Sequence, residues 1–313
     1  MTATARAGRA LIDDCWVDGT ILLGFCDSHV HLGAVDAAEL VPHGIARVLD
    51  LGWDPEIARR WPARAHPRGL AVDIAGAVLT ARGGYPGSPG WAPAAAAREI
   101  HSPTEAESAI ADIRSIGGRV AKIALNSEVG PVWPDDLLET VVSIAHRSGL
   151  PVLAHAEGAG QAERALTAGV DALAHTPWTE RLNDKLLRRM AGRLSWISTI
   201  DIHGWGSYGG DFHRAFGNLE RFAAVGGQVY YGTDLGNGPL PVGLNRRELD
   251  ALCASLPGGE SVIGSLGGIL PPLEQPRTVS FIPGPAYDNS TDLVDWLCTS
   301  VVLAVTHLEE IPT

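Results

Sequence analysis

The chain of 313 residues has few positive charges, few cysteines and no long apolar run. Its 24 Lys and Arg are outnumbered by 36 Asp and Glu, which gives a net charge of −12, and no basic cluster stands out. Nucleic acids and anionic membrane surfaces both select clustered positive charge, so neither is expected as a partner. No apolar run reaches the ~18 residues that a membrane span needs. The composition therefore predicts a soluble globular protein.

The scarcity and spacing of cysteine bear on the compartment. Four cysteines are scattered along the chain without a CxxC spacing, which favours reduced thiols over disulfides or a cysteine-based metal site: Cys15, Cys26, Cys253 and Cys298. Residues 1–14 lack the apolar core of a secretory signal. These features predict a cytoplasmic protein.

Short apolar runs alternate with segments of helical periodicity. Eight runs are strand candidates, namely residues 21–25, 46–51, 70–79, 120–125, 151–155, 172–175, 194–199 and 228–232. Helical patterns between them include residues 134–148, 160–168, 183–191 and 211–224. Such alternation predicts a parallel sheet with right-handed crossovers. Eight units over roughly 230 residues fit a (β/α)8 TIM barrel, whose usual length is ~250 residues. A doubly wound open sheet is the alternative, but no GxGxxG follows a strand.

The two chain ends do not fit the barrel pattern. After residue 256, Gly and Pro punctuate the sequence, and residues 278–282 and 298–305 have the character of strands. We therefore expect a barrel over residues 21–256, with residues 1–20 and 257–313 forming a small β appendage beside it.

An Asp-x-His-x-His run, from Asp27 through His29 to His31, follows the first apolar segment. Side chains alternate along a strand, so these three residues point to one face. Two imidazoles presented together from one strand are half of a metal site.

Other polar residues occur where later strands end, which is where the chemistry of a barrel collects. His155, His175 and Asp234 each follow an apolar run, and Lys122 lies inside one. A buried lysine is costly unless its charge is removed or paired. Reaction with carbon dioxide would convert Lys122 into a carboxylated oxygen ligand that can bridge two metal ions.

This combination resembles the amidohydrolase superfamily of metal-dependent hydrolases, in its imidazolonepropionase-like and Xaa-Pro-dipeptidase-like branch. The matching segments cover about residues 20–256 in the family's order, namely residues 27–32, 48–52, Lys122, 155–175 and 231–234. The resemblance implies that the terminal appendage is the reduced remnant of a β-sandwich.

The resemblance also implies a ligand set for two divalent ions, made of His29, His31, Lys122, His155, His175 and Asp234. His29 and His31 would bind the first ion with Asp234, and carboxylated Lys122 would bridge to the second. Asp234 would also take the proton of the attacking water. Zinc suits these ligands, although manganese, iron or cobalt could occupy them.

The expected function is a hydrolase that uses a metal-bridging hydroxide to cleave an amide or cyclic amide bond of a small substrate. A lactone, ester or carbamate hydrolase on the same site remains open. So do a mononuclear barrel lyase such as a decarboxylase, and a metal-poor binding protein without turnover.

Substrate contacts are expected from the loops that follow the strands. Arg82 and Tyr85 lie in a Gly- and Pro-rich loop over residues 82–93, and His203 follows the seventh strand. We predict these three residues as substrate-binding. The expected partner is a small molecule, and a homo-oligomer stays open.

Overall fold

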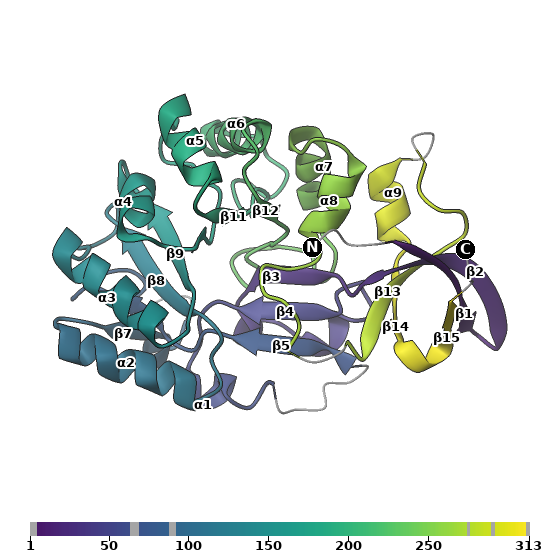
Figure 1. Ribbon diagram of the computed structural model, residues 1–313, viewed down its shortest axis with the longest axis horizontal. Helices are drawn as coiled ribbons and strands as arrows, with labels where there is room; N and C mark the ends of the chain where they lie inside the picture. Colours follow the sequence, from purple (N-terminus) through teal and green to yellow (C-terminus); the bar gives the residue numbers. More distant parts are fainter. Residues whose placement is uncertain (1–4, 63–68, 88–91, 274–275, 289–291, 311–313) are drawn as a thin grey trace.

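The computed structural model describes residues 5–62, 69–87, 92–273, 276–288 and 292–310 (Figure 1). Within these ranges, a barrel of parallel strands is joined to a smaller antiparallel sheet. None of the helices in the described part of the chain has both the length and the apolarity needed to cross a lipid bilayer.

The barrel strands follow one another round the ring in chain order. They are β3 (Cys26–Val30), β4 (Arg47–Asp50), β5 (Ala71–Ile74), β6 (Val78–Thr80), β8 (Ala121–Asn126), β9 (Val152–Glu157), β10 (Ala172–Leu173), β11 (Ser195–Ile197) and β12 (Val229–Tyr230). All of their pairings are parallel. β5 and β6 share the third position, because Gly76 adopts a left-handed φ of 78° and interrupts the predicted strand 70–79.

Backbone hydrogen bonds between β3 and the segment after β12 close the ring. The Asp234 N–H donates to the His29 carbonyl at 2.8 Å, and the His31 N–H donates to the Leu235 carbonyl at 2.7 Å. The predicted (β/α)8 barrel is thereby confirmed. β7 (Ala97–Glu99) lies outside the expected eight strands and pairs with β6.

Helices surround the barrel on its outer side (Figure 1). They are α1 (Pro55–Ala58), α2 (Pro103–Ser115), α3 (Asp135–Arg147), α4 (Gln161–Ala168), α5 (Asp184–Ala191), α6 (Gly210–Ala224), α7 (Arg246–Ser255), α8 (Gly259–Ser265) and α9 (Leu293–Cys298). The four helical segments expected from periodicity are present as α3 to α6. In α3, Leu138, Val141, Val142 and Ala145 are buried at helical spacing, which turns one face of the helix to the barrel.

Both chain ends contribute to the five-stranded antiparallel sheet, whose order is β14-β13-β2-β1-β15. Its strands are β1 (Arg6–Ile12), β2 (Cys15–Leu23), β13 (Thr278–Pro283), β14 (Val301–Ala304) and β15 (Leu308–Glu310). In Figure 1 these purple and yellow strands lie side by side at one end of the molecule. The predicted β appendage from the two termini is therefore present.

Two strand boundaries predicted near this sheet are wrong. Residues 21–23 end β2 of the appendage, and the first barrel strand begins only at Cys26. The apolar run continues from the end of β2 to the start of β3, so hydrophobicity alone does not show where the appendage sheet ends and the barrel begins. Residue 298 ends α9, and β14 starts at Val301.

The barrel interior is filled by side chains and does not form a pore. A buried cluster of small and branched residues occupies it: Leu49, Leu51, Ala75, Val120, Leu153, Ala172, Ala174 and Ile197. Ile269 and Leu270 pack against this cluster. Because the interior is closed, a site built from the barrel strands is expected at the rim where the strands end.

Candidate metal centre

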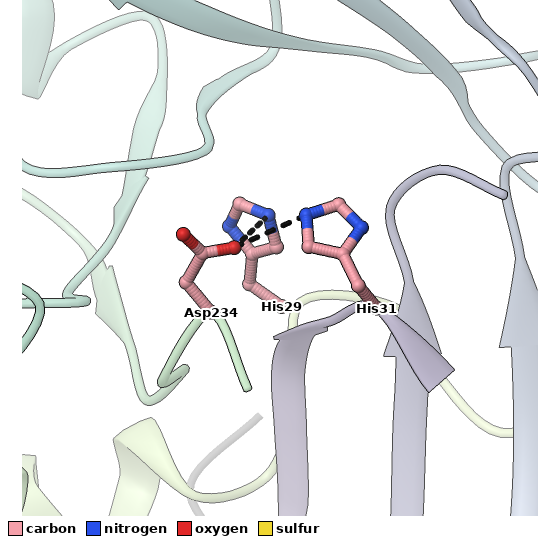
Figure 2. A group of neighbouring side chains, drawn as sticks. All are labelled: His29, His31 and Asp234. Atoms are coloured by element: carbon pink, nitrogen blue, oxygen red, sulfur yellow. Dashed lines mark ion pairs between the residues drawn. The ribbon is translucent and has the colours of Figure 1, made fainter. Parts of the chain in front are cut away.

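His29 and His31 are presented to this rim by β3 and by the residue after it. Both side chains are buried, with 1% and 6% of their surface exposed. Figure 2 shows their rings on one side of β3, with Asp234 reaching toward both. The Nε2 atoms of His29 and His31 each lie 3.1 Å from Asp234 Oδ1. Two imidazoles and one carboxylate therefore converge on a single position.

Asp27 fixes the relative positions of these groups. Its carboxylate accepts hydrogen bonds from the His29 N–H at 3.1 Å and the Thr233 N–H at 3.0 Å. The Thr233 hydroxyl donates to the second oxygen at 2.5 Å. Burial raises the pKa of Asp27 to about 7, although these hydrogen bonds oppose the shift. Asp27 thus ties the first barrel strand to the segment that carries Asp234.

The ring nitrogens of His29 and His31 are assigned by their partners. His29 Nδ1 donates to the Ala174 carbonyl at 2.9 Å, and His31 Nδ1 donates to the Gly52 carbonyl at 3.0 Å. A carbonyl can only accept, so both Nδ1 atoms carry a proton, and in the neutral ring that binds a metal each Nε2 has the lone pair. These lone pairs are on the nitrogens that face Asp234.

His155 differs from His29 and His31, because its hydrogen bond to the protein uses Nε2 instead of Nδ1. Its Nε2 lies 2.9 Å from Glu157 Oε2, which leaves Nδ1 as the free ligand atom. His175 resembles the first pair, because its Nδ1 lies 2.9 Å from the Thr199 hydroxyl. The ring centroids of His155 and His175 are 5.0 Å apart, and His175 lies 4.6 Å from His29. The four rings therefore form one contiguous group.

Lys122 reaches the same place from β8, with only 3% of its surface exposed. Burial lowers the pKa of its amine to about 7, although the charges of Asp234 and Asp50 oppose the shift. An amine with a pKa of about 7 is neutral in about half of the molecules near pH 7, and the neutral form is the one that reacts with carbon dioxide.

These side chains surround one cavity of about 130 Å³. Its lining comprises His29, His31, Leu51, Val78, Tyr85, Pro86, Lys122, His155, Glu157, His175, Trp178, Ile202, Asp234 and Asn237. All six predicted metal ligands are in this set. The structure thus brings together the residues that the sequence selected, and their roles in binding metal stay predictions.

The donor set fits a divalent cation. His29 Nε2 and Asp234 Oδ1 are both buried without a hydrogen-bond partner. Ligand atoms of His29, His31 and Asp234 lie within 4.8 Å of one another. Burial opposes ionisation of Asp234, but the neighbouring histidines outweigh it and hold its pKa well below the usual range. Burial keeps the pKa of His29 low, which favours the neutral imidazole that a metal requires.

The three predicted substrate contacts differ in position. Tyr85 lines the cavity and stacks on His155 at a centroid distance of 4.8 Å. His203 is outside the lining but contacts Trp178 at 4.9 Å, and its Nε2 is buried without a hydrogen-bond partner. Arg82 is exposed and is not brought to the cavity, because the loop turns its side chain to solvent near Glu99.

Some residues of the site were not predicted from the sequence. Asp50 accepts hydrogen bonds from the Leu32 and Gly52 N–H groups, which fixes the turn beside His31. Asn237 donates to Asp234 Oδ2 at 2.8 Å. Glu157 lines the cavity, and it lies two residues after His155 on β9. This period of two was the signal that could have identified Glu157.

No family model matches the sequence, and no curated protein is significantly similar to it. Similar solved structures include a Xaa-Pro dipeptidase with bound methionine in its active site, at 18% identity and a TM-score of 0.71, covering 93% of this chain and 87% of that one. A putative prolidase from Bifidobacterium longum gives 19% identity and a TM-score of 0.67, covering 92% and 80%. Molinate hydrolase gives 17% identity and a TM-score of 0.67, covering 92% and 83%. The chain therefore shares the fold of solved prolidases and amidohydrolases, which agrees with the resemblance stated from the sequence.

Proposed function

We propose that the protein is a metal-dependent hydrolase that cleaves an amide or cyclic amide bond of a small substrate. The observation that carries the proposal is the convergence of four histidines, a buried lysine and a buried aspartate on one cavity at the strand ends. The likeness in fold to a Xaa-Pro dipeptidase, molinate hydrolase and phenylurea hydrolase B supports a C–N bond as the target.

We propose that His29, His31 and Asp234 hold one divalent ion and that His155 and His175 hold a second. Carboxylated Lys122 would be a ligand of both, and zinc is the expected metal. When bound, such ions lower the pKa of water and polarise a carbonyl group.

The remaining chemistry belongs to residues of the chain. Asp234 accepts the proton of the attacking water on its carboxylate and delivers it to the leaving nitrogen. Asn237 holds the second carboxylate oxygen by its hydrogen bond, which fixes the first oxygen toward the histidines. Tyr85 and Trp178 form walls that confine a compact substrate.

The proposal also covers organisation and compartment. Residues 21–256 would form the domain that carries the site, and residues 1–20 and 257–313 the appendage. Residues 21–23 are the exception, because they complete β2 of the appendage sheet. All four cysteines are free thiols, in keeping with a cytoplasmic protein.

Hydrolysis is tested by offering the metal-loaded protein a panel of Xaa-Pro dipeptides, N-acyl amino acids, lactams, aryl ureas and lactones in H₂¹⁸O. We expect turnover of at least one amide-type substrate, with one ¹⁸O in the product acid by mass spectrometry. Turnover confined to lactones would move the activity to C–O bonds. Loss of a substrate carboxyl group as carbon dioxide, with every C–N bond of the substrate intact, would identify a lyase and contradict the proposal.

A further inference from the structure

Glu157 places a carboxylate at the wall of the cavity. It lines the cavity with 22% of its side chain exposed. Among the described residues, its ion pairing is limited to His155, which is charged only when protonated. A histidine that binds a metal is neutral, so among the described residues Glu157 then has no cationic side chain as a partner.

Hydrogen bonds hold this carboxylate in place without neutralising it. Asn126 Nδ2 donates to Glu157 Oε2 at 2.6 Å, and His155 Nε2 approaches the same oxygen at 2.9 Å. Both contacts use one oxygen, and Oε1 accepts no hydrogen bond from the described part of the chain. The carboxylate is therefore fixed in position with one oxygen available to a ligand.

The surroundings of Glu157 also suit a cation. Tyr85 stacks on His155 at 4.8 Å, and the Trp178 ring lies 5.7 Å from it, so two aromatic rings line the same wall. Aromatic faces attract cations. Among the described lining residues, Lys122 is the single Lys or Arg, and it is buried within the proposed ligand set. The described lining of the cavity thus offers no guanidinium to pair with a substrate carboxylate.

We propose that Glu157, with Tyr85 and Trp178, forms a subsite for a positively charged group of the substrate, such as an ammonium. The inference rests on the proposed function, because it requires His155 to be a neutral metal ligand. It makes the substrate class an amide that carries a cationic group, and it makes Glu157 the residue that selects it.

Three small ligands of similar shape test the charge preference without turnover. Choline is a cation and 3,3-dimethylbutan-1-ol is its neutral counterpart with the same hydroxyl group, so any contact of that hydroxyl with a metal is common to both. The third ligand, 3,3-dimethylbutanoate, is an anion whose carboxylate reports on metal coordination. Calorimetric titration of the metal-loaded protein should give a choline affinity about tenfold above that of the neutral alcohol. Equal affinities of choline and the neutral alcohol, or no choline binding, would overturn the inference.

Two matched variants identify the residue responsible. Glu157→Gln removes the charge but retains an oxygen that accepts from Asn126 and His155, so the preference for choline should disappear. Glu128→Gln removes the charge of an exposed neighbour outside the cavity lining and should leave the preference intact. A preference that survives in Glu157→Gln with unchanged metal content contradicts the assignment. Inactivity on every amide, with the choline preference intact, would instead refute the proposed hydrolysis.

Discussion

Lys122 is one of only two lysines in the chain, and it is the buried one. Its amine lies among neutral imidazoles and the Asp234 carboxylate, in a place where an ammonium group would lose most of its hydration. Carboxylation removes this cost and adds an oxygen ligand. The unusual placement of the residue is thus explained by the chemistry proposed for it.

Replacing Lys122 with Ala should therefore abolish most metal binding, because the ligand shared by the two ions is lost. Short carboxylates such as acetate or propionate should restore part of the metal content and activity by filling the vacated space. Metal analysis after dialysis measures the effect, and Lys185→Ala, on the exposed side of α5, is the matched control. Two ions retained in Lys122→Ala without added carboxylate would contradict the bridging role.

Asp234 has a separate task that a substitution can isolate. Asp234→Asn keeps an oxygen near His29 and His31 but cannot accept a proton, so the turnover number should fall at least about 100-fold. Much of the metal should remain bound, as measured in the same samples. Asp211→Asn, an exposed carboxylate on α6, should change neither quantity. Unchanged turnover in Asp234→Asn would remove this residue from the mechanism.

At the scale of single residues, all six predicted ligands line the cavity, whereas of the three predicted substrate contacts only Tyr85 lines it. His29 and His31 are specified by alternation along one strand, and His155 and His175 by their positions at strand ends. Arg82 could not be placed in this way, because the direction of a side chain in a Gly- and Pro-rich loop depends on turns that composition does not determine.

The junction between β3 and β12 is the element on which the site depends most. Asp27 and Thr233 make the side-chain contacts across it, and the carboxylate is fully buried. A buried acceptor that loses its donor is costly. The contacts that close the barrel between β3 and the segment after β12 therefore also align Asp234 with His29.

Thr233→Val removes the hydroxyl that donates to Asp27 while preserving the shape of the side chain. The free energy of unfolding should fall by about 1–3 kcal/mol, because an oxygen of the buried carboxylate is left unsatisfied. Urea denaturation of the metal-free protein measures this, and Thr167→Val on the exposed face of α4 should cost less than about 0.5 kcal/mol. Equal effects of the two substitutions would contradict the role given to this contact.

Helix α7 holds the loop after β11 through a buried carboxylate. Glu248 accepts hydrogen bonds from the Ile200 and Asp201 N–H groups at 3.0 and 2.9 Å. Burial raises the pKa of Glu248 to about 7, above the ordinary value of 4.5, and the hydrogen bonds oppose the shift. Folding therefore favours the protonated form of this side chain.

The folded state binds the Glu248 proton more tightly than the unfolded state does. The protonated Glu248 side chain therefore contributes to the free energy of unfolding. This contribution is fully present below pH 4.5 and is lost as the pH rises to about 7, where the folded protein also releases the proton. The difference in unfolding free energy between wild type and Glu248→Gln should accordingly shrink by up to about 3 kcal/mol over this interval. Urea titrations at each pH measure it. A difference that grows with pH would show that Glu248 is ionised in the folded protein.

The helices and strands of the barrel were predictable because the spacing of apolar and polar residues in the sequence indicates which face of each element is buried. α3, with apolar residues at helical spacing, matches its predicted segment within a residue at each end. The predicted third strand, residues 70–79, and the predicted first strand, residues 21–25, differ more from the structure. Gly76 splits one into β5 and β6, and the apolar run at residues 21–25 passes from β2 toward β3 without a change of character. The pattern of apolar residues along a strand does not indicate which sheet the strand joins, because pairing depends on residues far away in the sequence.

For the molecule as a whole, the barrel packs its interior and confines the chemistry to one rim. The appendage joins the two chain ends in a single antiparallel sheet away from the ring (Figure 1). Acidic residues outnumber basic ones by 36 to 24, which agrees with a small-molecule substrate rather than a nucleic acid. The described lining of the cavity contains no arginine. Fold, charge and site thus agree with one kind of activity.

The central claim is that this rim holds two divalent ions, and metal content per chain tests it most directly. Protein purified without chelators or a histidine-rich tag would be analysed by plasma mass spectrometry, before and after reconstitution with zinc and bicarbonate. We predict about two ions per chain, because the six predicted ligands all line the cavity. One ion, or none after reconstitution, would contradict the two-metal centre.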